Sequence, residues 1–394
     1  MAKGNEAFIR GFSGAASLLS LGILYLVFNG SVIINAYLID SQNYIVGRDF
    51  VNFWQYGIAA WQDAPERFYE PYFYNARLDL LTPGQDYPDQ LWSYPPHFML
   101  LMAPFGLISY HVALAVFTVA GLIVWWAVAA KPLANRSASL ALFTSPFLAI
   151  CLVSGQLSLF VAAIFVWLYR NLDTRPVLSG VLIALLTVKP HLGLLIPLYL
   201  ILTQRWQVFI AAALASLVFI GLSLLIHGIG VWQAYLDLGV KYQAQILEGS
   251  TTLVDGLMPT ALMNMVAAGA GSSLAIFTHA IFAIAAIVWF YATVLKSNDH
   301  LIQFAALLVA TYILSPYMMA YDFIALIWVM VMLAYRKPFD QFQKMTFRLI
   351  VFLPVISVLL AQMAIPGSAI IPVLLAFWLW TCRHDQPIAQ DIPR

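Results

Sequence analysis

The feature that most limits the fold of this chain is a series of long apolar stretches with few charged residues inside them. An α-helix needs about 20 apolar residues to cross the hydrocarbon core of a bilayer. Charged residues make up 9% of the sequence, whereas a soluble globular chain carries roughly a quarter. The sequence therefore predicts an all-α protein that crosses a membrane many times. The clearest spans are residues 15–39, 111–130, 206–229, 272–295, 318–335, 346–364 and 367–381.

Two further apolar stretches are interrupted by polar residues, so the number of spans within them stays open. Residues 138–169 contain Ser154-Gly155-Gln156, and residues 177–203 contain Lys189-Pro190-His191. Each stretch is either one long helix or a pair of short helices that meet at the polar residues. Together with the clear spans, they predict about 11–13 transmembrane helices. No internal repeat or low-complexity tract divides the sequence, so we treat residues 1–394 as a single domain.

The charged residues suggest which side of the membrane each loop faces, because Lys and Arg in short loops favour the cytoplasm. Lys3 and Arg10 precede the first span, whereas acidic residues outnumber basic ones at residues 40–95. We therefore expect both termini in the cytoplasm and residues 40–95, a first loop with short interfacial helices, on the outer face. A second loop at residues 230–270 falls on the same face and is a candidate to close over a substrate. A bacterial inner membrane suits this arrangement.

Two arrangements of residues 96–203 remain open. In the first, residues 96–109 form a half-helix on the outer side, and both interrupted stretches are hairpins whose polar tips point outward. In the second, residues 96–109 form a full span and residues 177–203 a single helix. The second places most of the cations between these segments outside, so the preference of cations for the cytoplasm favours the first.

The first candidate for chemistry is Asp49, which follows Arg48 shortly after the first span. A carboxylate at the mouth of a membrane cavity is partly desolvated, which raises its pKa and makes it a usable general base. The alternative is a solvated loop acid beside an arginine. Composition alone leaves both interpretations open.

At the end of the same loop, Trp92-Ser93-Tyr94-Pro95-Pro96-His97 leads the chain back into the apolar phase. The two prolines fix an extended turn, and aromatic residues around such a turn suit the membrane interface. His97 can donate a hydrogen bond to a phosphate or sugar oxygen. A histidine satisfied by protein partners at the interface is the competing explanation.

Lys189 is the sharpest isolated signal, because it lies far from either end of its apolar stretch. An ionisable residue at such depth is energetically expensive and marks a functional site by default. A lysine there can supply the positive charge that a phosphate needs in a water-poor cavity. The alternative is that Lys189 snorkels or pairs with an acid such as Asp322. Gln156, at the other break, is placed to bond sugar hydroxyls or to join helices.

Asp322 follows the Ser315-Pro316-Tyr317 corner at the outer start of an apolar stretch. Its carboxylate either accepts hydrogen bonds from free backbone N–H groups of the corner or faces a cavity and orients a ligand. The sequence favours the structural role.

Several classes of chemistry find no support in the sequence. A phosphate-binding P-loop, a dinucleotide-binding glycine fingerprint and a His-Glu-x-x-His helix are all missing. The two cysteines, Cys151 and Cys382, lie in or next to apolar runs, so neither a disulfide framework nor a thiolate metal site is expected. We expect no cofactor and no metal. The net charge of +1 gives no reason to expect nucleic acid as a partner.

The order and spacing of these elements resemble the GT-C transferases that use polyprenyl-phosphate mannose, in glycosyltransferase family 87, the group of the phosphatidylinositol-mannoside mannosyltransferases. The resemblance runs from about residue 10 to residue 335. It is carried by Arg48-Asp49-Phe50, Phe68-Tyr69, Tyr94-Pro95-Pro96, Gly155-Gln156, Lys189-Pro190, Ser315-Pro316 and Tyr321-Asp322.

The resemblance implies a GT-C fold, a sugar donor carried on polyprenyl phosphate, transfer with inversion at the anomeric carbon, and no required metal. It implies that Asp49 deprotonates the acceptor hydroxyl. The commonest donor sugar of the family is mannose, but the residues do not separate mannose from another hexose or a pentose. They also leave open whether the acceptor is a glycolipid or another glycan, and they do not give the oligomeric state.

The resemblance assigns no role to the remaining candidates, so we infer their roles from their chemistry. We expect the donor phosphate to be bound by Lys189, His97, His191 and Arg48. We expect the sugar or the acceptor to be bound by Gln156, Tyr94 and Asp322. Two rival functions are a flippase for lipid-linked sugars and a ligase that moves whole glycans. A flippase is disfavoured because paired inverted repeats are missing, and a ligase because residues 230–270 lack several arginines.

Overall fold

The computed structural model describes residues 1–382 except Lys3, Asn35, Gln42, 84–86, Leu91 and 247–255. Parts of the two predicted outer loops, including Asp86, therefore lie outside the described residues. The described chain is helical apart from a two-stranded antiparallel hairpin of β1 (Val32–Ile34) and β2 (Tyr37–Ile39), in which Val32 pairs with Ile39. This confirms the predicted all-α class of polytopic membrane protein.

The hairpin corrects the first predicted span, residues 15–39. The first helix, α1 (Asn5–Phe28), begins and ends about ten residues earlier. Gly30 ends it with a φ of 83°, which residues other than glycine rarely adopt. The β-branched run Val32-Ile33-Ile34 then favours a strand.

Within the described residues, four helical segments are long and apolar enough to cross a membrane, and two bent pairs raise this number to six. The sequence predicts about 11–13 spans. Among the described helices, length and composition support four to six of them, and the other apolar helices have only 10–17 residues. The four long segments are α1, α5 (Tyr110–Trp125) with η3 (Trp126–Ala130) and η4 (Lys131–Leu133), α12 (Trp206–Ala234) with η6 (Tyr235–Gly239) and the start of α13 (Val240–Ile246), and α16 (Ser272–Lys296).

The bent pairs and the shorter helices complete the bundle. The pair α6 and α7 bends by 45°, and the pair α19 and α20 bends by 69°. Their bounds, with those of the remaining elements outside the first loop, are α6 (Arg136–Phe143), α7 (Pro146–Ser154), α8 (Ser158–Asn171), α9 (Pro176–Leu185), η5 (Leu186–Val188), α10 (Pro190–Gly193), α11 (Ile196–Leu202), α15 (Ala261–Ala267), α17 (His300–Leu314), η7 (Ala320–Phe323), α18 (Ile324–Leu333), α19 (Gln341–Val351), α20 (Leu353–Gln362) and α21 (Ile370–Cys382).

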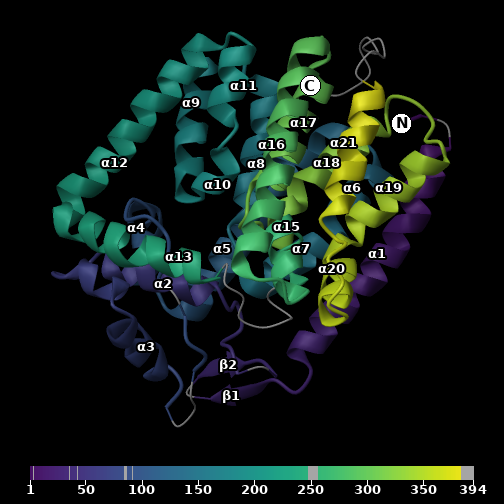
Figure 1. Ribbon diagram of the computed structural model, residues 1–394. Coiled ribbons are helices and arrows are strands. Elements are labelled where there is room, and N and C mark those ends of the chain that lie inside the picture. The colour runs from purple at the N-terminus through teal and green to yellow at the C-terminus, as the bar shows by residue number, and fades with distance from the viewer. Residues whose placement is uncertain are drawn as a thin grey trace.

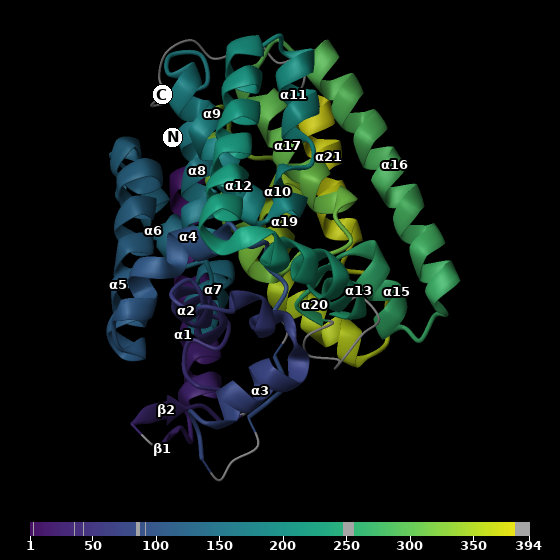
Figure 2. The same ribbon diagram turned by 90° about the vertical axis from the view of Figure 1, so that its left-hand side faces the viewer.

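In both interrupted stretches, one helical segment ends and the next begins at the polar residues. In the first, α7 ends at Gly155 with a φ of 63°, and α8 begins at Ser158. In the second, Lys189 has non-helical dihedral angles between η5 and α10, and Pro190 opens α10, where its missing N–H is not needed. Figures 1 and 2 both place α9 and α11 at one level with α10 below them, so the chain reverses direction at Lys189. This reversal is what the hairpin arrangement of residues 177–203 predicts.

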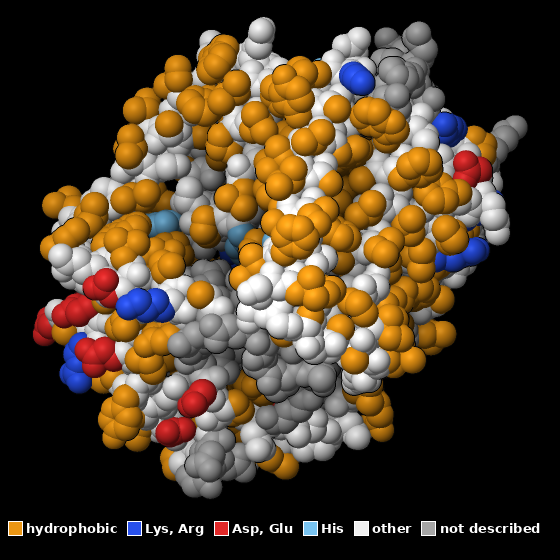
Figure 3. Space-filling model, viewed as in Figure 1, with side chains coloured by type: hydrophobic (Ala, Val, Ile, Leu, Met, Phe, Trp, Pro, Cys, Tyr) orange, Lys and Arg blue, Asp and Glu red, His pale blue; other side chains and the backbone are white. Residues whose placement is uncertain are grey.

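One end of the bundle gathers the start of α1 and several cationic loops. The Asn5 amide donates to the carbonyls of Ala334 at 3.0 Å and Lys337 at 2.8 Å, and the Tyr335 hydroxyl donates to the Leu133 carbonyl at 3.4 Å. The first loop lies at the other end, where β1, β2 and α3 are drawn (Figure 1). Between the ends, hydrophobic side chains cover most of the visible flank, as lipid contact requires (Figure 3). The cations of these loops are Lys131, Arg136, Arg336 and Lys337.

The first outer loop contains the expected short helices, α2 (Phe50–Ala59), η1 (Pro65–Tyr69) and α3 (Pro71–Asp79). It packs tightly on the half-helix made of α4 (Phe98–Met102) and η2 (Ala103–Leu107). A Cβ atom at Gly57 would lie 2.4 Å from the Met102 carbonyl oxygen, so only glycine permits this approach.

Hydrogen bonds tie the two ends of the first loop together. The hydroxyls of Tyr56 and Tyr69 both donate to the Tyr94 carbonyl, at 2.8 and 2.7 Å. The rings of Tyr56 and Trp92 stack with their centres 3.5 Å apart. These contacts fix the end of the loop relative to α2 and therefore relative to Asp49.

Candidate active site

The candidate base lies where the first loop meets the first helix break. The Asp49 backbone N–H donates to the Ser154 carbonyl at 3.0 Å, at the end of α7. The contact is close because Gly155 has no side chain: a Cβ atom there would lie 2.6 Å from Phe50 Cβ and 2.8 Å from the Gly47 carbonyl oxygen. Local backbone geometry in two distant segments thus delivers Asp49 to the break.

The Asp49 carboxylate has a neutral hydrogen-bond partner. Gln156 Nε2 donates to Asp49 Oδ2 at 2.8 Å. The orientation of the Gln156 amide follows from its other end, where Oε1 accepts from the Tyr94 hydroxyl and from the Leu157 N–H, both at 3.4 Å. In this structure Gln156 therefore orients the candidate base, and the sugar contact that the sequence suggests for it stays a prediction.

The environment of Asp49 favours its neutral form. Burial raises the pKa of the Asp49 carboxyl above its usual range, although the hydrogen bond from Gln156 and the charges of Lys189 and Arg48 act to lower it. A raised pKa makes the carboxylate a stronger proton acceptor, which suits a general base.

The second helix break places Lys189 in a buried ion pair. Lys189 is 3% exposed, and its Nζ lies 2.7 Å from Asp322 Oδ1. Ser158 donates to the same carboxylate oxygen at 2.7 Å, and the Lys189 ammonium lies 4.8 Å from the centre of the Tyr321 ring. Pairing with Asp322, which the sequence left open as the alternative for Lys189, is thus present. The Asp322 carboxylate binds side chains, whereas the structural role we favoured was a bond to the backbone.

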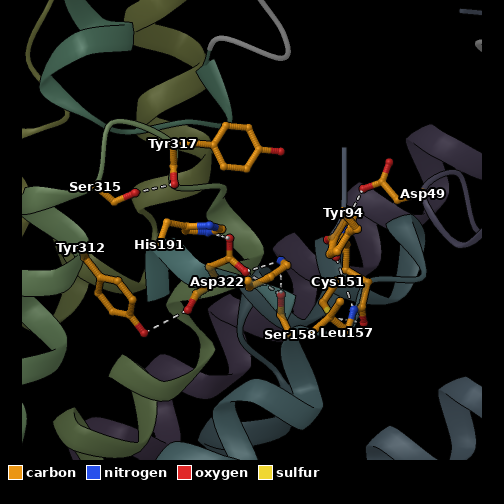
Figure 4. Close-up of polar contacts among 12 residues, drawn as sticks. Asp49, Tyr94, Cys151, Leu157, Ser158, His191, Tyr312, Ser315, Tyr317 and Asp322 are labelled. Atoms are coloured by element: carbon orange, nitrogen blue, oxygen red, sulfur yellow. Dashed lines mark hydrogen bonds and ion pairs between the residues drawn. The ribbon is translucent and has the colours of Figure 1, made fainter. Parts of the chain in front are cut away.

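A small cavity joins the end of the first loop to the second break. Figure 4 shows the groups around it, with Asp49 beside Tyr94 and with Asp322 between His191 and Ser158. The cavity has room for little more than about one water molecule. A sugar therefore enters only if the walls move apart. The lining residues are Ser93, Tyr94, Pro95, Val188, Lys189, Pro190, His191, Tyr235 and Tyr317.

His191 contributes its ring to the cavity wall. Its Nε2 lies 3.9 Å from Asp322 Oδ2, and its ring meets the Tyr317 ring edge-on with the centres 5.4 Å apart. Of the predicted site residues, Tyr94, Lys189 and His191 line the cavity, and Asp49 is joined to Tyr94 through Gln156.

Two predicted phosphate ligands lie away from the cavity lining. His97 is 3% exposed, has its Nε2 at 3.0 Å from the Thr187 hydroxyl, and stacks on Trp232. Burial lowers the pKa of His97 to about 4, so the ring is neutral at pH 7. Arg48 Nε pairs with Asp40 at 2.8 Å. Protein groups bond one side of each side chain, while His97 Nδ1 and Arg48 Nη2 are buried without a hydrogen-bond partner among the described residues, so the phosphate contacts expected of both stay predictions.

The structure adds residues that sequence reasoning did not single out. Ser158 donates a hydrogen bond to Asp322. The sequence signal for Ser158 is that it is a polar residue in an apolar stretch, two positions after Gln156. Tyr235 lines the cavity from η6, beyond a break in α12 at Gly228, whose φ is 80°. Nothing in the sequence marks Tyr235, because its position depends on how α12 bends.

Comparison with known proteins adds one match. No curated protein and no solved structure matches the chain. The sequence model of glycosyltransferase family 87 matches residues 92–319, more than half of the 394 residues. The match contains Tyr94, Gln156 and Lys189, whereas Asp49 precedes it and Asp322 follows it. The chain therefore belongs to glycosyltransferase family 87 and is a membrane glycosyltransferase.

Proposed function

We propose that this glycosyltransferase moves mannose or another hexose from a polyprenyl-phosphate donor to a hydroxyl of a glycolipid or glycan. The observation that carries the proposal is the short segment from Gln156 to Ser158. Gln156 binds the Asp49 carboxylate, and Ser158, two residues later, binds Asp322, which holds Lys189. One segment thus links a proton acceptor to a cation, the two groups that displacement of a phosphate by a hydroxyl requires.

The proposed reaction is a single displacement. The acceptor hydroxyl gives its proton to Asp49, and its oxygen attacks the anomeric carbon on the face opposite the phosphate. The bond from that carbon to the phosphate oxygen breaks, and the electron pair leaves with the lipid phosphate. The charge of Lys189 stabilises the departing phosphate. Attack from the opposite face inverts the anomeric centre, and no step requires a metal or a cofactor.

Two features support a lipid-linked donor and an outward-facing site. The sequence lacks a nucleotide-binding motif, and a donor dissolved in the membrane needs none. Cations gather at the end of the bundle opposite the first loop, which favours a cytoplasmic position for that end and for both termini. We therefore place the active site on the periplasmic face of a bacterial inner membrane. Family membership favours transfer chemistry over the rival flippase.

The test uses purified protein, a panel of polyprenyl-phosphate sugars and a membrane lipid extract, with products identified by mass spectrometry. We expect one donor to yield a glycosylated lipid, and Asp49→Asn to lower turnover about 10²- to 10⁴-fold, the usual contribution of a general base. Asp63→Asn, an exposed acid of the same loop, is the matched control and should stay active. Full activity of Asp49→Asn, or transfer from nucleotide sugars alone, would contradict the proposal.

A further inference from the structure

The cavity is short of positive charge for a reaction that releases a phosphate. Among the described residues that line it, Lys189 is the single Lys or Arg, and Asp322 already neutralises it at 2.7 Å. Arg48 is paired with Asp40, and Asp49 adds a carboxylate nearby. When the bond to the sugar breaks, the lipid phosphate gains a second negative charge. A water-poor site with these partners stabilises that charge poorly.

His191 is placed to supply the positive charge that the cavity lacks. It lies next to Lys189 in the chain and lines the same cavity. Its Nδ1 and Nε2 are buried and make no hydrogen bond with the described residues, and the same holds for Asp322 Oδ2, the oxygen 3.9 Å from Nε2. Buried polar atoms in folded proteins are nearly always hydrogen-bonded, so unpartnered ones in a cavity wall point to a ligand.

The charged and titratable groups around the imidazole come from three elements. Asp322, from η7, faces Nε2; Lys189 precedes α10; and Tyr317 packs against the ring from the corner before η7. The Asp322 carboxylate favours the protonated ring, whereas burial and the Lys189 ammonium oppose it, so the negative charge of a bound donor phosphate is what favours the imidazolium in the occupied site. The carboxylate faces Nε2, which leaves the other nitrogen, Nδ1, for a ligand.

We propose that His191 is the second cation of this site and the proton donor to the departing phosphate. This inference rests on the proposed function. His191 binds the donor phosphate as an imidazolium while Asp322 faces Nε2. As the anomeric carbon–oxygen bond breaks, the electron pair moves to the phosphate oxygen and the proton on Nδ1 moves to a phosphate oxygen. The lipid phosphate leaves as a monoanion. Asp49 keeps the acceptor proton until it is lost to water, and water reprotonates His191.

The inference is tested by the pH dependence of turnover in the wild type, His191→Gln and His191→Lys. The wild type should lose activity in acid, where Asp49 is protonated, and in alkali, where His191 is neutral. His191→Gln should lower kcat about 10²-fold or more and lose the alkaline limb while the acid limb remains. His191→Lys keeps a cation, so its donor KM should stay near the wild-type value while kcat falls. His300→Gln, an exposed histidine at the opposite end, is the control.

A binding measurement gives a second readout that does not depend on turnover. The donor phosphate is a diester and does not titrate near neutral pH, so a pH effect on its affinity reports the protein. Without acceptor, the wild type should bind donor about tenfold more tightly at pH 6 than at pH 8, which corresponds to one pKa unit of coupling. His191→Gln should show no such difference.

The outcomes separate this inference from the proposed function. If the wild type uses no polyprenyl-phosphate sugar, both fail. If the wild type transfers sugar and His191→Gln keeps its kcat and its alkaline limb, only the role of His191 fails. If His191→Gln changes donor affinity equally at both pH values, His191 is a packing residue of the cavity wall.

Discussion

The first outer loop and the second helix break hold their charged groups in opposite ways. In the loop, Asp49 has the neutral Gln156 as its hydrogen-bond partner, and the charges of Lys189 and Arg48 act on its carboxylate without forming an ion pair, so no bonded cation neutralises it. At the second break, Lys189 is 3% exposed and its charge is neutralised by Asp322. An uncompensated acid can change protonation during a reaction, whereas a buried ion pair is fixed by the fold. Substitutions in the loop should therefore affect chemistry, and substitutions at the break should affect stability as well.

The largest effect on stability should follow the loss of Lys189. Lys189→Met leaves Asp322 buried without its cation and should lower the free energy of unfolding by about 3–5 kcal/mol. Asp322→Leu in the same chain should recover most of this loss, because the pair is then replaced by apolar groups. Both variants should lack transfer activity. Unfolding is measured by thermal or denaturant titration in detergent. A double variant that is no more stable than Lys189→Met would contradict the ion-pair explanation.

Gly155→Ala should separate the loop from the break. The new Cβ atom meets Phe50 and the Gly47 carbonyl, and the φ of 63° strains any other residue. We expect a loss of about 1–3 kcal/mol of stability and lower turnover, because the backbone bond from Asp49 to Ser154 must lengthen. Gly221→Ala, with open space around its Cβ, is the matched control. Equal activity and stability in the two variants would show that the contact is not required.

The pH dependence of turnover probes the uncompensated acid. Asp49 must be ionised to accept a proton, and burial raises its pKa, so activity should fall on acidification at a pH above the ordinary aspartate value of about 3.9. Gln156→Leu removes a hydrogen bond that lowers this pKa and should move the acid limb to higher pH. The check is kcat/KM against pH for both proteins. An unshifted acid limb would mean that another group controls it.

Arg48→Gln should have the smallest effect. The Arg48 side chain is 19% exposed and pairs with the buried Asp40, which also accepts from the Tyr44 N–H, so its loss should cost about 1.5 kcal/mol of stability. Because Arg48 does not line the cavity, the KM for the donor should stay the same. A clear rise in donor KM would restore the role in phosphate binding that the sequence suggested.

Much of the site was accessible from sequence, although the partners were not. Gly155 and Pro190 mark helix ends by their backbone properties, so the two breaks were visible as polar residues in apolar stretches. Lys189 was conspicuous because a buried cation is costly. Tyr235 has no equivalent signal in the sequence. Ligand contacts are predicted for His97 and Gln156, whose hydrogen-bond partners in this structure are protein groups.

Local chemistry is what the sequence alone determines in this protein. Hydropathy places the chain in a lipid bilayer. Its glycine, proline and charged residues determine where its helices break and where its first loop begins. The tertiary structure determines which residues the breaks contact. Gln156 lies 107 positions from Asp49, and Lys189 lies 133 positions from Asp322. In a membrane, the pattern of apolar residues does not determine which helices pack together, because lipid is as apolar as the helices and packing alone selects the contacts.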